Sequence, residues 1–351
     1  MDRRTVDAYE GDAAAERFLR ERRAFRPERA SSFASRTAGV RVDVGAGVGH
    51  YTPLLGQPIV SLDASHAMLR VLRREHPGAA CIQADVAALP LRERSLHGAW
   101  AARTYQHIDH GELPLALADL HRALEVGAAV SLHVFSGEGA ERRPEDDSFP
   151  GRLFALWDPG QLRAVIEGAG FAIDAFDVDD ERNIEIEATR ALLLPDFVRP
   201  DLRVLFCGYN PSIYAAERGV PFARPGNRFW PAALEAGVVS VDRDPWHAVT
   251  NHGVGFTDLV KRATVAASEL STDELRGGLA RVTRVCEWLR PQVVCVLGVG
   301  GWRTVVDRRA QVGWQERRIG PSRVYVMPNP SGLNASTQHA GFVEHLRNLA
   351  A

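Results

Sequence analysis

The sequence predicts an α/β protein made of two domains. Short apolar runs alternate with helical patterns from about residue 40 to 194, which is the rhythm of a parallel sheet with crossover helices. A second series of such runs begins after the proline-bearing stretch 191–202, where we place the domain boundary. At 351 residues the chain is long enough for each domain to bury its own core.

Three segments follow from this organisation. Residues 1–38 are predicted to be helical, and we assign them no chemistry; residues 39–190 and 199–351 are the two predicted domains. The predicted strands cover 40–47, 58–65, 80–86, 97–103 and 128–137 in the first domain and 202–208, 292–300 and 323–328 in the second. The helices predicted in the second domain cover 228–237, 271–290 and 337–350.

Composition narrows the class of protein. A hydrophobic content of 45% and a charged content of 25% are ordinary for a globular domain. The sequence contains no long apolar run and no signal-peptide core, so we expect a cytoplasmic protein without a membrane partner. The four cysteines form no Cys-x-x-Cys pair, which predicts free, mostly buried thiols and no metal cluster.

The charge differs between the two halves. From Arg199 onward the chain holds 19 basic and 13 acidic side chains, a net charge of +6. The preceding residues hold the other 23 basic and 31 acidic side chains, a net charge of −8. This asymmetry suggests that the C-terminal half meets a polyanion such as nucleic acid, although moderate basicity is also common without such a partner.

A glycine-rich turn follows the first predicted strand in "VDVGAGVGHY" (42–51). Its glycines allow a tight turn and the close approach of a ligand to the backbone. Asp63 ends the next strand at a spacing that lets a carboxylate reach ribose hydroxyls, and Asp85 ends the third strand, where it can accept from an adenine amine. These features predict a site for a nucleoside-containing cofactor.

This arrangement resembles the class I S-adenosylmethionine-dependent methyltransferases over about residues 35–180. "LADLHRALEVGAAVSLHVF" and "LWDPGQLRAVIEGAGFAI" look like later elements of that family. An NAD-binding half is the rival, but "GAGVG" is not Gly-x-Gly-x-x-Gly. The resemblance implies a Rossmann-like sheet, S-adenosylmethionine as cofactor, and an acceptor that the sequence does not name. The cofactor-binding residues that it implies are Asp43, Gly45 and Gly47 for the methionine part, Asp63 for the ribose, and Asp85 with Val86 for the adenine.

His107 lies after the fourth strand, where acceptor contacts often fall. A capping or core histidine is the simpler interpretation, and we prefer it to a catalytic role.

A second motif ends the last predicted strand, in "PNPSGLN" (328–334). Its polar residues stand where an α/β sheet presents ligands, and Leu333 is apolar at a position expected to face solvent. Together with "GYNPS", "PFARPGNRFW" and the weaker "GFTDLVKR", it resembles the mismatch-specific uracil/thymine-DNA glycosylases of the uracil-DNA glycosylase superfamily, over about residues 200–350. The resemblance implies a three-layer α/β/α domain that needs no cofactor.

The resemblance also implies roles for individual residues. Asn210 would hold the attacking water, Phe222 would stack on an extruded base, and Leu333 would fill the gap that the base leaves. Asp258 is either a catalytic base or an exposed helix cap. The substrate-binding residues implied are Gly208, Tyr209, Phe222, Asn329, Ser331, Gly332 and Leu333.

Some positions depart from related families. Several of those families have Asp at the position of Asn210 or His at that of Asn329, and some have Arg at that of Ala335. The choice of opposing base therefore stays open. Phosphate contacts are expected from four basic residues that flank the motifs, which are Arg224, Arg228, Lys261 and Arg262. Of these, Arg228 is either a phosphate ligand or a structural ion-pair partner.

The sequence thus predicts a DNA repair glycosylase fused to a methyltransferase domain of unknown acceptor. The glycosylase substrate would be uracil, and by extension thymine, in a G·U or G·T mismatch of double-stranded DNA. The alternative is a nucleic-acid methyltransferase whose C-terminal domain only binds DNA or RNA.

Overall fold

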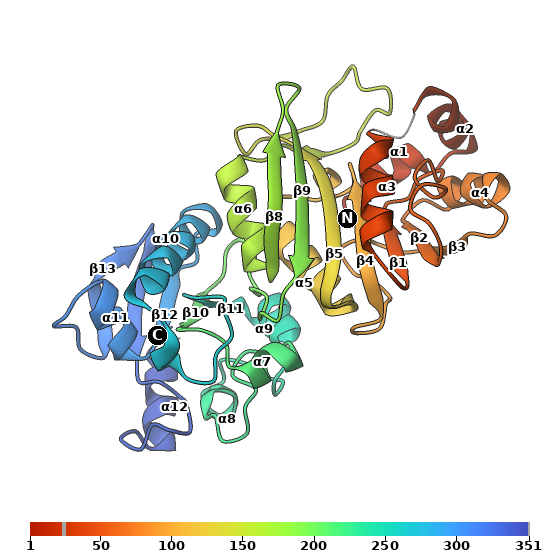
Figure 1. Ribbon diagram of the computed structural model, residues 1–351. Helices are drawn as coiled ribbons and strands as arrows, with labels where there is room; N and C mark the ends of the chain where they lie inside the picture. The colour runs from red at the N-terminus through yellow and green to blue at the C-terminus, as the bar shows by residue number, and fades with distance from the viewer. Residues whose placement is uncertain (23–25, 350–351) are drawn as a thin grey trace. The chain divides into compact units, whose positions relative to one another are not determined.

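The computed structural model describes residues 1–22 and 26–349 (Figure 1). The chain forms two compact units, of which unit 1 comprises Met1–Ile166 with Phe171–Ala191, and unit 2 comprises Glu167–Gly170 with Leu192–Ala351. Residues 23–25 of the predicted helical segment and residues 350–351 of the predicted second domain lie outside the described residues.

Unit 1 is built on a seven-stranded sheet with the order β3-β2-β1-β4-β5-β9-β8. The first five strands run parallel, and β9 and β8 form an antiparallel hairpin at one edge. Five of these strands were predicted, and they are confirmed. The strands are β1 (Arg41–Val44), β2 (Ile59–Asp63), β3 (Ala80–Gln83), β4 (Leu96–Ala102), β5 (Leu124–Phe135), β8 (Phe171–Val178) and β9 (Asn183–Arg190).

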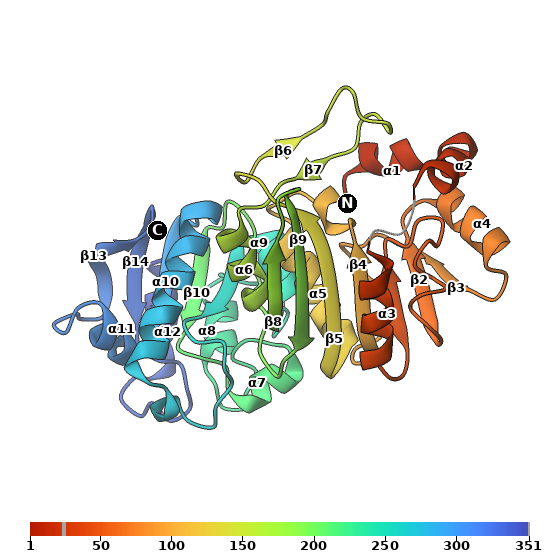
Figure 2. The same cartoon turned by 45° about the horizontal axis from the view of Figure 1, so that its top comes forward.

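Helices cover both faces of this sheet, with α3 in front and α5 behind in Figures 1 and 2. A separate short hairpin, β6 (Glu141–Arg142) with β7 (Phe154–Ala155), projects beyond the sheet (Figure 2). The helices that begin in unit 1 are α1 (Arg3–Tyr9), α2 (Asp12–Glu21), α3 (Pro27–Arg36), α4 (His66–Glu75), the 3₁₀ turn η1 (Tyr105–His107), α5 (Leu113–Ala123) and α6 (Pro159–Gly168).

The N-terminal helices belong to the core of unit 1. Ala15 is buried with Val48, Ala67, Met68 and Val71, which ties α2 to the glycine loop and to α4. Partly buried side chains of the N-terminal segment pack on the same cluster, and they are Tyr9, Phe18 and Leu19. Apolar burial of this kind stabilises the segment on the rest of the unit.

Unit 2 contains a five-stranded sheet with the order β11-β10-β12-β14-β13. All neighbouring strands are parallel except β13, which runs antiparallel to β14 at the edge. The strands β11 and β13 were not predicted. The five are β10 (Val204–Gly208), β11 (Val254–Asp258), β12 (Val293–Leu297), β13 (Gly313–Ile319) and β14 (Ser322–Met327).

The helices of this unit include two contacting pairs: α10 contacts α11, and α8 contacts α12. The three helices predicted in this unit correspond to α8, α10 and α12. The helices are α7 (Ile213–Arg218), α8 (Phe229–Glu235), α9 (Pro245–His252), η2 (Ala267–Glu269), α10 (Thr272–Leu289), α11 (Val299–Val305) and α12 (His339–Arg347). The predicted fold class, two α/β domains in succession, is confirmed. Among the described residues, no helix is long and apolar enough to cross a membrane.

A buried charged cluster supports β11 in unit 2. The Asp196 carboxylate accepts from Lys261 Nζ at 2.7 Å and from Arg281 Nη1 at 2.6 Å, and it also accepts from the Thr257 hydroxyl at 2.7 Å. These cations hold the pKa of Asp196 low in spite of its burial. Arg281 also donates to the Asp258 carbonyl at 2.7 Å, so the cluster fixes the end of β11. Such pairing is needed because an unpaired buried charge is strongly destabilising.

Candidate functional sites

A cavity of about 340 Å³ in unit 1 lies beside the glycine loop, at the carboxyl ends of the parallel strands. Four of the predicted cofactor residues line it, namely Gly45, Gly47, Asp63 and Val86. Asp43 and Asp85 are not among its lining residues. Asp43 is buried in β1, and the Asp85 carboxylate accepts from the Met1 amine at 2.7 Å.

The glycine loop and Asp63 hold each other in place. The Asp63 carboxylate accepts from Gly47 N–H and from Ser65 N–H, both at 2.8 Å. Gly45 has φ +73°, and a Cβ there would lie 2.2 Å from Thr104 Oγ1, so no other residue fits. This close approach of the loop to Thr104 shapes the cavity wall.

The pKa values of two carboxyl groups under this loop, those of Asp43 and Asp63, are raised. Burial raises the pKa of Asp43 to about 8, and the nearby charge of Asp63 adds to the effect. Burial also raises the pKa of Asp63, whereas its backbone hydrogen bonds oppose that rise. One oxygen of Asp43, Oδ2, is buried and has no hydrogen-bond partner among the residues that the structure describes. Both groups therefore favour a positively charged ligand nearby.

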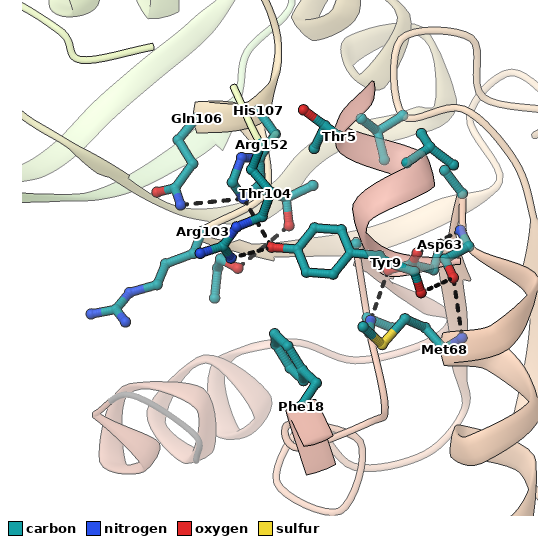
Figure 3. A pocket seen from close by; sticks show the side chains of 18 of the residues that line it. Thr5, Tyr9, Phe18, Asp63, Met68, Arg103, Thr104, Gln106, His107 and Arg152 are labelled. Atoms are coloured by element: carbon teal, nitrogen blue, oxygen red, sulfur yellow. Dashed lines mark hydrogen bonds between the residues drawn. The ribbon is translucent and has the colours of Figure 1, made fainter. Parts of the chain in front are cut away.

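The N-terminal helix α1 lies across this cavity, which sequence reasoning missed. Tyr9 extends through the middle, between Asp63 and Met68 on one side and the Arg152 end on the other (Figure 3). Ser65 Oγ donates to the Tyr9 carbonyl at 2.9 Å, and Leu153 N–H donates to Thr5 Oγ1 at 2.8 Å. No motif in residues 1–38 signals this role, because the contacts join segments far apart in the chain.

His107 lines the same cavity, at the end occupied by Arg152 (Figure 3). Its Nδ1 lies 2.6 Å from the Leu153 carbonyl oxygen, which can only accept, so Nδ1 carries the proton. Burial lowers the pKa of His107 to about 4. The ring is therefore neutral, and its Nε2 lies 3.4 Å from the Tyr9 hydroxyl. The preferred interpretation, a core histidine, agrees with this burial, and a catalytic role stays a prediction.

Unit 2 contains a second cavity, of about 410 Å³, at the carboxyl ends of its own parallel strands. It brings together eight of the nine residues predicted for this site, and Gly332 is the ninth. The eight lining residues are Gly208, Tyr209, Asn210, Phe222, Asp258, Asn329, Ser331 and Leu333.

The Asn210 side chain is oriented by hydrogen bonds from its amide nitrogen. Nδ2 donates to the Arg262 carbonyl at 2.9 Å and to Thr264 Oγ1 at 2.7 Å. Within the described part of the chain, no donor is bonded to Oδ1. Since Asn210 lines the cavity, its carbonyl oxygen is the polar atom left to accept from a ligand or a water.

Asp258 ends β11 and is only 4% exposed, so the prediction of an exposed helix cap is wrong. Burial raises its pKa to about 6, although the charge of Lys261 opposes the rise. No donor within residues 1–22 and 26–349 is bonded to its carboxylate. A Cβ on Gly208 would lie 2.3 Å from Asp258 Oδ1, so Gly208 leaves the space that the carboxylate occupies. A buried, unpartnered carboxylate in a cavity is a candidate general base.

Phe222 has a backbone conformation that bulky residues rarely adopt, with φ +54°. Its ring packs on Phe229 at 4.7 Å and on Phe256 at 6.2 Å between centroids, while it also lines the cavity. Strain of this kind persists only where the surroundings enforce it, and it is concentrated at functional sites.

The loop after β14 is organised by Asn329 and Arg228. Asn329 Oδ1 accepts from Ser331 N–H at 2.9 Å, which leaves its Nδ2 group as a donor. Arg228 donates to the carbonyls of Thr337, Ser331 and Asn334, and its guanidinium lies 4.7 Å from the Phe342 ring centre. Arg228 is therefore a structural residue that binds backbone carbonyls, neither a phosphate ligand nor an ion-pair partner.

The other predicted phosphate ligands have different environments. Lys261, the only lysine, is buried in its pair with Asp196 and cannot reach a phosphate, so that prediction is wrong. Arg262 is exposed but paired with Glu274 at 2.8 Å. Arg224 is exposed and lines the cavity, and its guanidinium makes no ion pair within the described residues.

The four cysteines are free thiols; Cys207, Cys286 and Cys295 are buried and Cys81 is partly buried. Among the described residues, no group of three His, Cys, Asp or Glu side chains could hold a metal ion.

The described residues form two α/β units, and each unit has a cavity at the carboxyl ends of its parallel strands. Comparison with known families identifies both. Residues 42–132 match the methyltransferase domain, and residues 195–350 match the uracil DNA glycosylase superfamily. The chain thus carries a methyltransferase domain followed by a domain of the uracil DNA glycosylase superfamily.

Several solved structures resemble part of the chain. An S-adenosylmethionine-dependent methyltransferase from Methanosarcina mazei is 16% identical, with 43% of this chain and 92% of that one covered and a TM-score of 0.39. The 1,6-didemethyltoxoflavin-N1-methyltransferase of Burkholderia thailandensis, solved with S-adenosylhomocysteine, is 18% identical, with 47% and 78% covered and a TM-score of 0.39. A methyltransferase from Aquifex aeolicus is 16% identical, with 54% and 100% covered and a TM-score of 0.39.

The role of Arg228 generates a prediction about stability. Arg228→Met keeps an apolar stem on Phe342 but removes the donors to three carbonyls, so we expect the free energy of unfolding to fall by about 2 kcal/mol. Amide hydrogen exchange in residues 329–337 should rise, as measured by mass spectrometry. Arg224→Met is the matched control and should change neither quantity. Equal protection of the loop in both variants would contradict the structural role of Arg228.

Proposed function

We propose that unit 2 is a DNA glycosylase that hydrolyses the N-glycosidic bond of mispaired uracil, and by extension of thymine. The observation that carries this proposal is the orientation of Asn210. Its amide nitrogen is engaged by Arg262 and Thr264, so the carbonyl oxygen is left to accept from a water in the cavity. The match of residues 195–350 to the uracil DNA glycosylase superfamily supports it.

In this mechanism the base leaves the duplex and enters the cavity beside Phe222, which stacks on it. Asn329 Nδ2 donates to a carbonyl of the base and stabilises the negative charge that develops on it. Water bound to Asn210 Oδ1 attacks C1′ as the bond from C1′ to the base nitrogen breaks. The products are the free base and an abasic sugar. The only lysine is buried and paired with Asp196, which makes water the nucleophile in this scheme.

We assign two tasks to Asp258. Its carboxylate, ionised above its pKa of about 6, stabilises the positive charge that builds up on the sugar in the transition state. It also takes the proton that the attacking water loses. The absence of a bonded donor at this buried carboxylate, within the described residues, supports both tasks.

The DNA partner is recognised in this proposal by shape and by charge. Leu333 is 89% exposed at the cavity rim and is placed to fill the gap in the base stack. Arg224 is the candidate phosphate ligand. A mispaired base is the easiest to extrude because it gives up the least pairing energy. Double-stranded DNA with a G·U or G·T mismatch is therefore the proposed substrate, and base excision repair the proposed process.

The glycosylase assignment predicts uracil release from a G·U duplex, measured as strand cleavage after alkaline treatment. Asn210→Ala should lower the single-turnover rate constant at least about a hundredfold, because the water loses its acceptor. Ser240→Ala, far from the cavity residues, is the control. If Asn210→Ala retains full activity, its role is wrong. If the unaltered protein leaves G·U, A·U and single-stranded uracil DNA intact, unit 2 is a binding domain instead.

Asp258 predicts a pH dependence. The single-turnover rate constant should be constant above about pH 6 and fall about tenfold for each pH unit below it, as the base becomes protonated. Asp258→Asn should be slow and should not show this loss of rate in acid.

The raised pKa of Asp258 also predicts a pH dependence of stability, because ionisation of Asp258 destabilises the fold as pH rises through about 6. Asp258→Asn should thus raise the melting temperature near neutral pH, with a smaller gain in acid; the opposite trend would contradict the assignment.

We further propose that unit 1 binds S-adenosylmethionine and transfers its methyl group to an acceptor of unknown identity. The residues fit this cofactor. The loop at Gly45 and Gly47 brings the backbone to the cavity wall, Asp63 presents a carboxylate for ribose hydroxyls, and the buried acids Asp43 and Asp63 favour a cation. Val86 lines the cavity as predicted for the adenine part. The match of residues 42–132 to the methyltransferase domain supports the proposal.

When bound, S-adenosylmethionine supplies an electrophilic methyl group. The chain's own residues provide the enclosure: Tyr9, Phe18 and Phe154 line the cavity and limit water. His107 Nε2, unprotonated on a neutral ring, lies 3.4 Å from the Tyr9 hydroxyl and 3.5 Å from the Gln106 amide nitrogen, so a methyl acceptor that uses it would displace one of these contacts. This arrangement supports methyl transfer to an oxygen or nitrogen nucleophile.

Calorimetry tests the cofactor assignment. Titration of the full chain with S-adenosylmethionine should release heat of binding, whereas NAD should not. Asp63→Asn should weaken the affinity at least about tenfold, because both the ribose contact and the loop support are lost. Asp174→Asn, on the surface of the same unit, is the control and should bind normally. Equal affinity of the two variants would reject the role of Asp63.

A further inference from the structure

A second exposed apolar side chain lies at the unit 2 cavity. Val265 is 81% exposed and Leu333 is 89% exposed, and these are the two highest values among the large apolar side chains of the described residues. Both residues line the same cavity. Exposed apolar groups of this size are ordinary when scattered, but two of them at one cavity indicate a contact surface.

Val265 belongs to a braced loop. Thr264 N–H donates to the Pro211 carbonyl at 3.2 Å, and Thr264 Oγ1 donates to the Ala266 carbonyl at 2.9 Å. Ala266 N–H in turn donates to Glu269 Oε1 at 2.8 Å. These hydrogen bonds define the backbone of the loop on which the exposed Val265 side chain stands.

The loop is joined directly to Asn210. Thr264 Oγ1, one residue before Val265, accepts from Asn210 Nδ2 at 2.7 Å. The same bond that turns Asn210 Oδ1 toward the cavity therefore also sets the position of Val265. Asn210 and Val265 both line the cavity.

Val265 and Leu333 belong to loops that follow two different strands of the sheet. Val265 follows β11 and Leu333 follows β14, and β10 and β12 lie between these strands in the order β11-β10-β12-β14. A ligand that enters the cavity can therefore contact apolar side chains from two different loops. Leucine is long enough to fill a vacated base step, whereas the shorter, β-branched valine suits packing against a sugar or a base face.

We propose that Val265 holds the DNA strand that carries the target base, by packing against the sugar and base next to the extruded nucleotide. This inference rests on the proposed glycosylase function. The two apolar residues then differ in the DNA that they serve. Leu333 contributes only with duplex DNA, where the opened base step must be filled, whereas Val265 contributes with both single-stranded and double-stranded DNA.

Single-turnover excision of uracil from a G·U duplex and from the same strand alone tests this assignment. Val265→Ser should raise the half-saturating enzyme concentration about fivefold on both substrates, as expected for lost apolar contact, and leave the saturated rate within about twofold. Leu333→Ser should impair the duplex alone. Val265→Ile should bind at least as well as the unaltered protein, and Val241→Ser, an exposed valine outside the cavity, should behave normally.

Each other outcome overturns the inference. A loss confined to the duplex would make Val265 a second wedge, and no loss on either substrate would remove it from the DNA surface. A fall in the saturated rate without a change in half-saturation would show that the valine only supports Thr264 and Asn210. In these three cases the unaltered protein still excises uracil, so the proposed function stands. Failure of the unaltered protein on both substrates would instead reject the proposed function and this inference with it.

Discussion

Both cavities depend on one constraint of parallel sheets, which is that a reversal of strand order leaves a crevice at the carboxyl ends of the strands. In unit 1 the central strand β1 has β2 as its neighbour on one side and β4 as its neighbour on the other. In unit 2 β10 is flanked in the same way by β11 and β12. The loop after the central strand carries Gly45 in one unit and Asn210 in the other. Residues from distant parts of the chain therefore meet at one edge.

Within unit 2, hydrogen bonds decide which atom of each polar side chain faces the ligand. Asn210 has its nitrogen engaged by Arg262 and Thr264, and it presents an acceptor. Asn329 has its oxygen engaged by Ser331 N–H, and it presents a donor. Two residues of the same type thus have opposite polarity in one cavity. An acceptor suits a water, and a donor suits a base that leaves with negative charge.

The sequence predicts eight of the strands, the glycine loop after β1, the asparagine-bearing loops of unit 2 and most of the lining residues, because these are local signals of periodicity and turn chemistry. It is insufficient where a role comes from tertiary contact. Nothing in the first helix indicates that Tyr9 crosses the unit 1 cavity. Likewise, Lys261 is basic in the sequence but neutralised by Asp196 in the fold, and Arg228 binds carbonyls that only the folded loop after β14 brings to it.

Two features of unit 2 oppose its stability, and this favours catalysis over binding alone. Phe222 adopts a disfavoured backbone conformation, and within the described residues Asp258 is buried without a bonded donor. A domain that only bound the phosphate backbone would need neither feature, and a carboxylate in its cavity would repel the ligand. The cluster of Asp196, Lys261 and Arg281 behind β11 keeps Asp258 in place despite its cost. Such an arrangement is expected when the carboxylate must face a sugar that becomes positively charged.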